Sequence, residues 1–146
     1  MTEAWVESAL ARLRAESGRS GTARREVVEF LGRQDCCLSA QEVHDGLRTA
    51  GARVGIASVY RTLEALDRSG LVQRIDLGDG VARFEAAHAG GEHHHHFVCD
   101  ACGKVEPFED PALEAALERI AGGRGYAVEA HDVVLRGGCG DCRPAA

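Results

Sequence analysis

Two Cys-x-x-Cys pairs in this chain have the spacing of metal ligands. Cys99 and Cys102 form the first pair, and Cys139 and Cys142 form the second. The turn inside each pair brings both sulfurs to one side, so that each pair can give two thiolates to one tetrahedral ion. Four sulfurs at about 2.3 Å from the ion describe a closed structural zinc site. The spacing therefore predicts structural zinc, with a disulfide or a redox pair as the alternative.

An unbroken run of four histidines immediately precedes the segment that carries the first Cys pair. In a β-strand, alternate side chains point to opposite faces. His93 and His95 would then serve one face of the strand. His94 and His96 would serve the other, so that two separate metal sites could begin here. The alternative is a solvated polar linker that binds metal only adventitiously. Further possible ligands elsewhere in the chain are Cys36, Cys37, Glu85, His88, Glu114 and His131.

The composition predicts one domain or two very small ones. The chain has 146 residues, of which 45% are hydrophobic and 5% aromatic, so the core must be mostly Leu, Val and Ala. No apolar run approaches the roughly 20 residues that span a bilayer, and the N-terminal residues lack the pattern of a signal peptide. We therefore expect a cytoplasmic protein with no membrane partner, whose six cysteines stay reduced.

Charge and metal-binding residues are divided unevenly along the chain. Residues 1–84 carry 12 arginines against 12 acidic residues, whereas residues 85–146 carry 5 basic against 11 acidic residues. Six of the seven histidines and four of the six cysteines lie in the second part. The division indicates two functions in two halves, and the neutral first half stays compatible with nucleic-acid binding despite the overall charge of −6.

The first 50 residues have the patterns of three helices. Residues 5–13 place apolar side chains at helical intervals, and a break with two glycines follows. Thr22 is expected to cap the second helix. Ser39 with Glu42 three positions later fits a capping box, which predicts a third helix that runs to about Ala50.

A fourth helix and a hairpin complete the first half. Apolar residues spaced three or four apart predict the helix between Gly55 and Gly70. Two alternating segments, 71–76 and 81–85, flank a Gly-Asp-Gly turn and predict a β-hairpin. Helix, turn, helix and two-stranded ribbon form the layout of a winged helix-turn-helix domain. A generic helical core with a surface hairpin is the alternative.

The solvent face of the fourth helix suits the major groove of DNA, which is wide enough for a helix with small side chains. Arg61 can pair with guanine or hold a phosphate, and Tyr60 can pack on a thymine methyl. The outward residues are predicted to be Ala57, Ser58, Arg61 and Ala65, with Tyr60 and Thr62 at the borders. Arginines expected to contact phosphates are Arg19, Arg24 and Arg25 near the second helix and Arg74 and Arg83 on the hairpin. An ordinary solvated face is the alternative, because acidic residues are interspersed with the arginines.

The second half is predicted to be a small α/β domain, which makes the whole chain α+β. A segment of small residues around 86–92 suggests a boundary between domains 1–86 and 87–146. We expect strands near 97–99 and 105–108, a helix over about 112–120 that ends at Gly122 and Gly123, and a longer strand over 126–135.

The chain resembles the ferric uptake regulator family of bacterial metal-responsive repressors over nearly its whole length. The segments that carry the resemblance are 22–25, 39–43, 55–63, 93–103 and 139–142. The His-rich segment most resembles the zinc uptake regulators within that family. The resemblance implies a homodimer whose N-terminal winged helix binds double-stranded operator DNA and whose C-terminal α/β domain dimerises through its sheet.

The resemblance also implies three metal sites. The structural zinc ligands correspond to Cys99, Cys102, Cys139 and Cys142. A sensory site at the hinge corresponds to Glu85, His94 and His96, with Cys37 where iron-sensing relatives usually have a histidine. An auxiliary site corresponds to His93, His95, Glu114 and His131. One thiolate with a carboxylate and two imidazoles suits tetrahedral zinc better than six-coordinate iron or manganese. The zinc-sensing relatives, however, usually carry a cysteine where this chain has Glu85.

These features predict a zinc-dependent transcriptional repressor rather than an enzyme, with no small-molecule substrate. The sequence offers no activated nucleophile and no nucleotide-binding loop. A repressor that responds to Fe²⁺ or Mn²⁺ is the nearest alternative, in which Cys37 is a bystander. Cys36 or His88 are alternative ligands for completing the sensory site. A zinc-dependent hydrolase built on the histidine run, or a zinc buffer, would belong to a different class.

Overall fold

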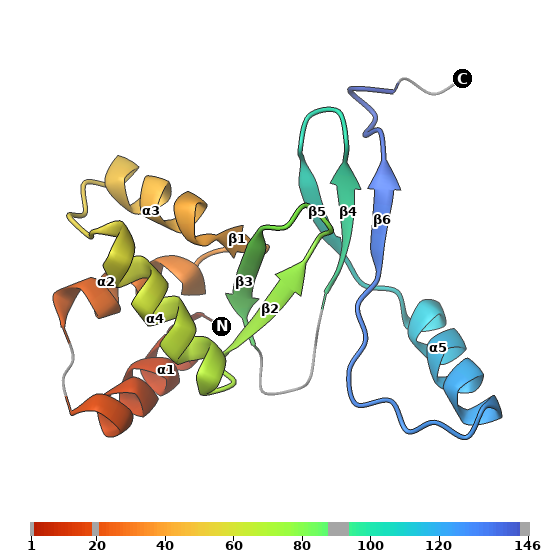
Figure 1. The fold of residues 1–146 in the computed structure, drawn as a ribbon, viewed down its shortest axis with the longest axis horizontal. Coiled ribbons are helices and arrows are strands. Elements are labelled where there is room, and N and C mark those ends of the chain that lie inside the picture. The colour runs from red at the N-terminus through yellow and green to blue at the C-terminus, as the bar shows by residue number, and fades with distance from the viewer. Residues whose placement is uncertain (1, 19–20, 88–93, 144–146) are drawn as a thin grey trace. The chain divides into compact units, whose positions relative to one another are not determined.

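In the computed structural model, the chain forms two compact units, Met1–Glu92 and His93–Ala146. The structure describes residues 2–18, 21–87 and 94–143. Among the described residues, the N-terminal unit combines four helices with a three-stranded sheet, and the C-terminal unit combines one helix with another three-stranded sheet (Figure 1). No helix among the described residues is long and apolar enough to cross a membrane.

The N-terminal unit packs four helices against one side of a small sheet. The helices are α1 (Thr2–Ser17), α2 (Thr22–Gly32), α3 (Ala40–Thr49) and α4 (Ile56–Arg68), and the strands are β1 (Leu38–Ser39), β2 (Val72–Asp76) and β3 (Ala82–Ala86). Leu31, Val43 and Leu63 belong to its buried core. The indole N–H of Trp5 on α1 donates to the carbonyl of Leu71, 2.9 Å away, which ties the first helix to the start of the hairpin.

The third helix begins as its sequence predicts. The side chain of Ser39 accepts from the backbone N–H of Glu42, and the Glu42 carboxylate accepts from the N–H of Ser39 at 2.7 Å, which completes the capping box. Gly51, with φ of 85°, follows the end of the helix. The second helix is present as predicted, but its predicted N-cap was wrong, since Thr22 is already helical and the N-cap is Gly21, which has no side chain to form a capping bond.

A two-residue strand absent from the prediction completes the sheet of the N-terminal unit. Strand β1 pairs antiparallel with β3, so that Leu38 faces Phe84 and Ser39 faces Arg83. The predicted hairpin is present, with β2 and β3 paired from Val72↔Ala86 to Asp76↔Ala82. Strand β1 is too short to show alternation, which explains why its sequence carried no signal.

The interior of α3 contains a glycine that the packing requires. A Cβ at Gly46 would lie 2.3 Å from the Phe30 ring of α2. Gly46→Ala is therefore expected to destabilise the N-terminal unit by about 1–3 kcal/mol through overpacking, even though alanine is the better helix former. Gly122→Ala is the matched control, because a Cβ there meets nothing within 4 Å. Denaturant unfolding of the two variants should show destabilisation in the first only, and equal effects would contradict the packing argument.

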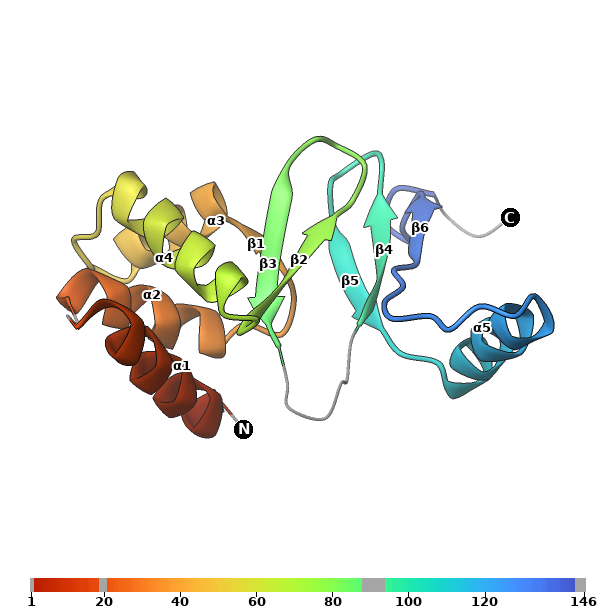
Figure 2. The ribbon, with the colours of Figure 1, turned by 60° about the horizontal axis from the view of Figure 1, so that its bottom comes forward.

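The C-terminal unit places one helix beside a mixed sheet (Figure 2). Its elements are β4 (His95–Cys99), β5 (Val105–Phe108), α5 (Pro111–Gly123) and β6 (Val134–Gly137). Strand β4 is central, antiparallel to β5 and parallel to β6. The helix starts at Asp110, whose carboxylate accepts from the N–H groups of Ala112 and Leu113.

Two boundaries in this unit differ from the sequence prediction. Helix α5 contains Gly122 and Gly123 and ends before Gly125, which has the left-handed φ of 74°. The strand predicted over 126–135 was wrong in its first eight residues, because parallel pairing with β4 begins only at Val134.

Candidate metal centres and nucleic-acid interface

The four cysteines of the two Cys-x-x-Cys pairs lie together in the C-terminal unit. Cys99 ends β4, Cys102 lies in the turn that follows it, and Cys139 and Cys142 follow β6. Their sulfurs all lie within 4.8 Å of one another, and those of Cys102 and Cys139 are 3.8 Å apart. Two sulfurs that are each about 2.3 Å from one tetrahedral ion are about 3.8 Å apart, so this set fits zinc.

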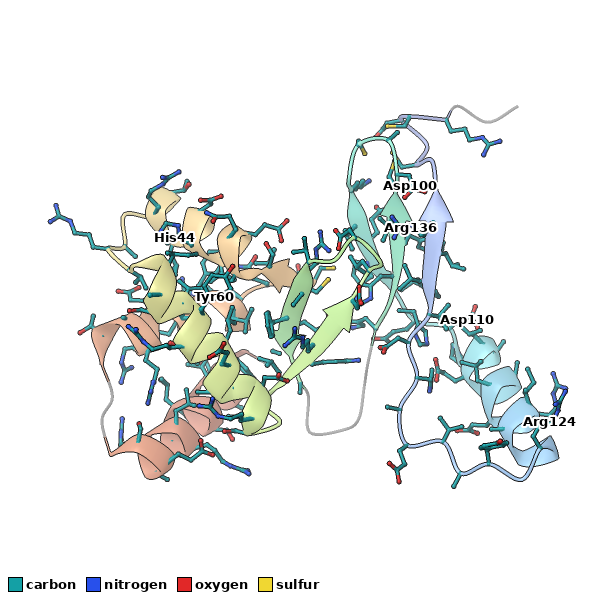
Figure 3. The ribbon with its side chains drawn as sticks, viewed as in Figure 1. His44, Tyr60, Asp100, Asp110, Arg124 and Arg136 are labelled. Atoms are coloured by element: carbon teal, nitrogen blue, oxygen red, sulfur yellow. The ribbon has the colours of Figure 1, made fainter. Side chains whose placement is uncertain are left out.

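The parallel pairing of β4 and β6 positions the two cysteine turns. Cys99 pairs with Gly137, and the N–H of Asp100 donates to the carbonyl of Gly137 at 2.8 Å. An ion pair of 2.7 Å between Asp100 and Arg136 links the same two strands near their C-terminal ends (Figure 3). A metal bound here would join the last residues of the unit to its central strand.

Electrostatics favour deprotonation of one of these thiols in particular. Backbone N–H groups of Cys139 and Cys102 lower the pKa of Cys99 to about 6, and the first of them lies 3.3 Å from its sulfur. Hydrogen bonds with Cys139 and Cys102 raise the pKa of Cys142 to about 12. One sulfur is thus ready as a thiolate, whereas four thiolates together need a cation to balance their charge.

A second cluster joins three residues predicted for the auxiliary site. Glu114 in the first turn of α5 bonds His95 of β4 at 2.5 Å and His131 at 2.8 Å. The N–H of Val133 donates to Nδ1 of His95, which orients the ring with Nε2 toward the carboxylate. The hydrogen bond with His95 lowers the pKa of Glu114, so the carboxylate is ionised. Two imidazoles and a carboxylate are a suitable donor set for a divalent transition metal. The fourth residue predicted for this site, His93, lies outside the described residues.

The residues predicted for the sensory site divide equally between the two units. Cys37 and Glu85 belong to the first unit, and His94 and His96 to the second. Cys37 directly precedes β1, and extension of the Leu38↔Phe84 pairing brings it opposite Glu85. The hydrogen bond with its neighbour Cys36, burial and the Glu85 carboxylate all raise the pKa of Cys37.

Glu109 contacts one of the predicted sensory residues, although no sequence pattern indicated this contact. His94, just before β4, bonds the carboxylate of Glu109 at 2.8 Å. His96 is buried within β4, and its backbone N–H donates to the carbonyl of Val133 at 3.0 Å. Glu109 follows β5 without any spacing that links it to a histidine, so only the paired strands bring the two together.

Helix α4 presents a polar surface, although one predicted position is wrong. Tyr60 is 52% exposed, and the exposed Arg61 donates to the Ser58 hydroxyl at 3.1 Å. Ala65, predicted to face outward, is only 6% exposed because it belongs to the core, and Thr62 is also buried. The exposed face of the helix therefore differs from the prediction and consists of Ala57, Tyr60, Arg61, Glu64 and Arg68.

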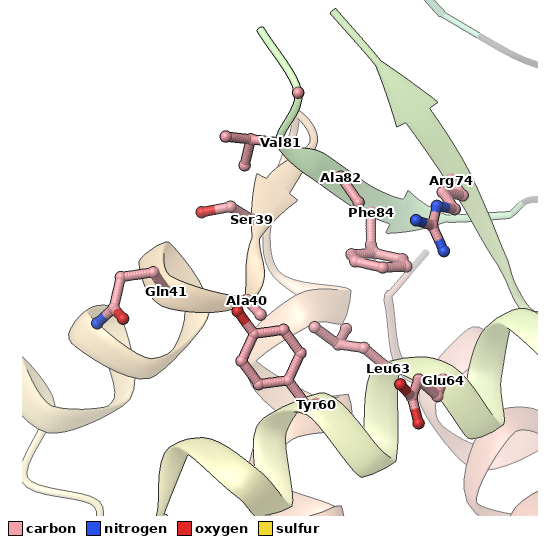
Figure 4. Close-up of a pocket in the computed structure, with 11 residues that line it drawn as sticks. Ser39, Ala40, Gln41, Tyr60, Leu63, Glu64, Arg74, Val81, Ala82 and Phe84 are labelled. Carbon is pink, nitrogen blue, oxygen red and sulfur yellow. The ribbon is translucent and has the colours of Figure 1, made fainter.

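A groove of about 460 Å³ lies between α4, the start of α3 and the hairpin (Figure 4). Tyr60 enters it from α4, and Arg74 borders it from β2. The Arg74 guanidinium lies 5.8 Å from the centre of the Phe84 ring, within the range of a cation–π contact. The groove thus combines an aromatic hydroxyl and a cation on the side where the helix and the hairpin meet.

The other predicted DNA-binding arginines have intramolecular roles in this structure. Arg24 of α2 bonds the hydroxyl of Ser17 at 2.5 Å, at the end of α1. Arg83 forms an ion pair of 2.8 Å with Asp79 in the hairpin turn. Arg25 pairs with Glu29 at 3.4 Å, one turn further along α2, and Arg19 lies outside the described residues. Arg61 and Arg74 also have intramolecular partners, the Ser58 hydroxyl and the Phe84 ring. They are nevertheless better placed for a phosphate or a base, because Arg61 is exposed on α4 and Arg74 borders the groove.

A winged helix followed by a unit with two metal-donor clusters defines a metal-responsive DNA-binding regulator. A sequence model of the ferric uptake regulator family matches residues 16–136, and the chain belongs to that family. The ferric uptake regulation protein of Bordetella parapertussis is 37% identical over 121 residues, 82% of this chain and 86% of that protein. The zinc uptake regulation protein of Mycobacterium tuberculosis is 37% identical over 127 residues, 86% and 95% of the two chains.

The fold of the chain is similar to that of solved structures of ferric uptake regulators. The ferric uptake regulator of Helicobacter pylori, which is described as having three functional metal binding sites, aligns with a TM-score of 0.80 at 29% identity, over 96% of this chain and 95% of that chain. The predicted α+β fold with a winged-helix domain is thereby confirmed. Members of this family are metal-dependent transcriptional repressors that bind operator DNA and act as dimers, so the prediction that the chain is not an enzyme is also confirmed.

Proposed function

We propose that this protein is a zinc-responsive repressor that binds operator DNA as a homodimer in the cytoplasm. The observation that carries the proposal is the division of one donor set between two units: Cys37 and Glu85 in the first, His94 and His96 in the second. A thiolate, a carboxylate and two imidazoles suit tetrahedral Zn²⁺. The Mycobacterium tuberculosis relative, which is named a zinc uptake regulation protein, supports this choice of metal.

The division of the donors supplies a mechanism. Donors from both units that share one ion hold those units at a fixed angle. In a dimer, this angle sets the separation of the two α4 helices, which must match successive major grooves about 34–36 Å apart. Zinc need not contact DNA. If zinc binds more tightly to the arrangement of the units that can bind DNA, zinc binding increases the population of that arrangement.

The C-terminal unit offers an apolar surface for a second copy of the chain. Helix α5 has no buried residue, and large apolar side chains on this unit remain exposed. They are Phe97, Ile120, Tyr126, Val128 and Leu135. Burial of such a surface in a dimer would remove it from water and would stabilise a unit whose own core is small.

The proposal predicts that operator binding requires metal. Full-length protein with its four-cysteine site filled should bind operator DNA in buffered free zinc. It should lose about 5- to 150-fold in affinity when a selective chelator removes the weaker ion, as coupling of about 1–3 kcal/mol implies. Electrophoretic mobility shift or fluorescence anisotropy measures the change, and refilling with zinc should restore it. Equal affinity with and without zinc, at unchanged dimer content, would contradict the proposed regulation.

Tyr60 and Arg61 are proposed to contact the operator. Arg61→Ala should cost about 1–3 kcal/mol for the specific sequence if the guanidinium contacts a base, and should weaken all sequences alike if it contacts phosphate. Arg68→Ala on the last turn of the same helix is the matched control, because it removes an equal charge. Affinities at several salt concentrations separate the two roles, and an unchanged affinity for Arg61→Ala would assign recognition to another surface.

A further inference from the structure

The thiols of two consecutive residues, Cys36 and Cys37, point to the same place. Their sulfurs are 3.9 Å apart, and neither forms a disulfide. Consecutive side chains of an extended chain point to opposite sides, so this approach is not a default of neighbouring residues. It arises because residues 35 and 36 form a bend between α2 and β1, before the pairing of Leu38 with Phe84 fixes the extended direction.

This separation equals that of two sulfurs bound to one ion. In the four-cysteine cluster, the sulfurs of Cys102 and Cys139 are 3.8 Å apart. Tetrahedral geometry with metal–sulfur bonds of about 2.3 Å requires a separation of about 3.8 Å. A disulfide would instead require about 2.05 Å. The pair therefore has the spacing of two thiolate ligands.

The surroundings of the pair hold it in place. Cys37 is buried, and Cys36 is half-buried. Strand β1 follows directly and pairs with β3, which fixes the direction of the chain immediately after Cys37. The donors that the N-terminal unit offers here are thus two neighbouring sulfurs next to a paired strand, with the Glu85 carboxylate on the strand opposite.

We propose that Cys36 is a metal ligand together with Cys37, so that the regulatory site is a two-thiolate site for a thiophilic cation such as Zn²⁺. His94 and His96 then complete a set of two sulfurs and two imidazoles, which is a closed tetrahedral zinc site. Cys36 thus replaces Glu85 in the donor set of the proposed function, and the Glu85 carboxylate on the strand next to Cys37 remains as a nearby charge. This proposal rests on the proposed function only in using these two histidines.

Co²⁺ bound at the regulatory site reports the number of thiolate ligands through its absorption. Full-length protein whose four-cysteine site is filled with zinc is titrated with Co²⁺, because absorption from sulfur-to-cobalt charge transfer grows with the number of bound thiolates. Cys36→Ser and Cys37→Ser should each lose about half of that absorption and weaken zinc binding at this site by at least about 10-fold, the low end of the cost of removing even an indirect partner of a ligand. The isosteric Glu85→Gln should keep the full absorption.

The outcomes separate this inference from the proposed function. Wild-type absorption and zinc affinity in Cys36→Ser would overturn the inference and leave a regulatory site with one thiolate. Cys36→Ala, which has no oxygen donor, must give the same loss as Cys36→Ser. An unchanged far-ultraviolet circular dichroism spectrum and an unchanged unfolding midpoint of the N-terminal unit show that each variant is folded. A two-thiolate signal in a wild-type protein whose operator binding ignores zinc would support the inference and reject the proposed regulation.

Discussion

Cys142→Ser is expected to lose one equivalent of tightly bound zinc and, with it, the ordered end of the C-terminal unit and the dimer. The sulfur of Cys142 is one of four that lie within 4.8 Å of one another. Structural zinc contributes about 10–16 kcal/mol in small zinc-binding peptides, and this unit has little buried apolar surface to replace such a contribution. Zinc content after exposure to a chelator, near-ultraviolet circular dichroism and size-exclusion chromatography together measure the loss.

Cys37→Ser is the matched control for that experiment. It removes one sulfur from the N-terminal unit and should leave the tightly bound zinc and the dimer intact, because Cys37 is not among the four clustered cysteines. A Cys142→Ser protein that stays fully dimeric and keeps its zinc would show that the cluster is not structural. Equal loss of zinc and of the dimer in both variants would instead show that replacing either cysteine destabilises the protein, whether or not that cysteine belongs to the cluster.

Local patterns in the sequence were sufficient for the elements that depend on local interactions. The capping box of Ser39 and Glu42 involves residues three positions apart, and the structure contains both of its hydrogen bonds. The Cys-x-x-Cys spacing is equally local, since one turn determines where both sulfurs point. In the N-terminal unit, the capping box, the Gly-Asp-Gly turn and the spacing of apolar residues predicted the helix–turn–helix and the hairpin.

The features that sequence reasoning missed depend on pairing between distant segments. Strand β1 exists because Leu38 meets Phe84 across the sheet, and nothing within its two residues indicates a strand. Ala65 is buried because α4 lies against other helices on more than one side, which makes its apolar stripe wider than spacing alone suggests. The contact between His94 and Glu109 likewise depends on the pairing of β4 with β5.

The metal clusters show the same division between local and distant information. The pattern of the histidine run places His95 and His96 on opposite faces of one strand, and both are buried in the structure. Which acid meets which histidine is decided by α5, whose first turn brings Glu114 to His95 and His131. A carboxylate in a helix cannot be matched to a histidine in a distant loop by spacing along the chain.

Zinc is expected to trigger operator binding at a far lower free concentration than Fe²⁺ or Mn²⁺, and Cys37→Ser is expected to remove most of that advantage. Any site of nitrogen, oxygen and sulfur donors binds Zn²⁺ more tightly than Mn²⁺ or Fe²⁺, so the informative quantity is the change in the ratio. Loss of a thiolate should raise the free zinc needed for half-maximal binding by at least about 10-fold and should affect Mn²⁺ much less, because Mn²⁺ prefers oxygen donors. Anaerobic titrations of operator binding with buffered metal measure each midpoint.

His131→Ala separates the regulatory site from the auxiliary cluster in the same titrations. His131 bonds Glu114 within the C-terminal unit, and a cluster confined to one unit cannot by itself hold two units at an angle. Its loss should therefore shift the zinc midpoint less than Cys37→Ser does. If Cys37→Ser responds at the wild-type free zinc concentration while His131→Ala does not, the regulatory ion is bound by Glu114 and the histidines of the C-terminal unit, and Cys37 is a buried thiol. If both variants keep the wild-type midpoints for zinc and for Fe²⁺, neither Cys37 nor His131 binds the regulatory ion, which is the result expected of an iron sensor in which Cys37 is a bystander.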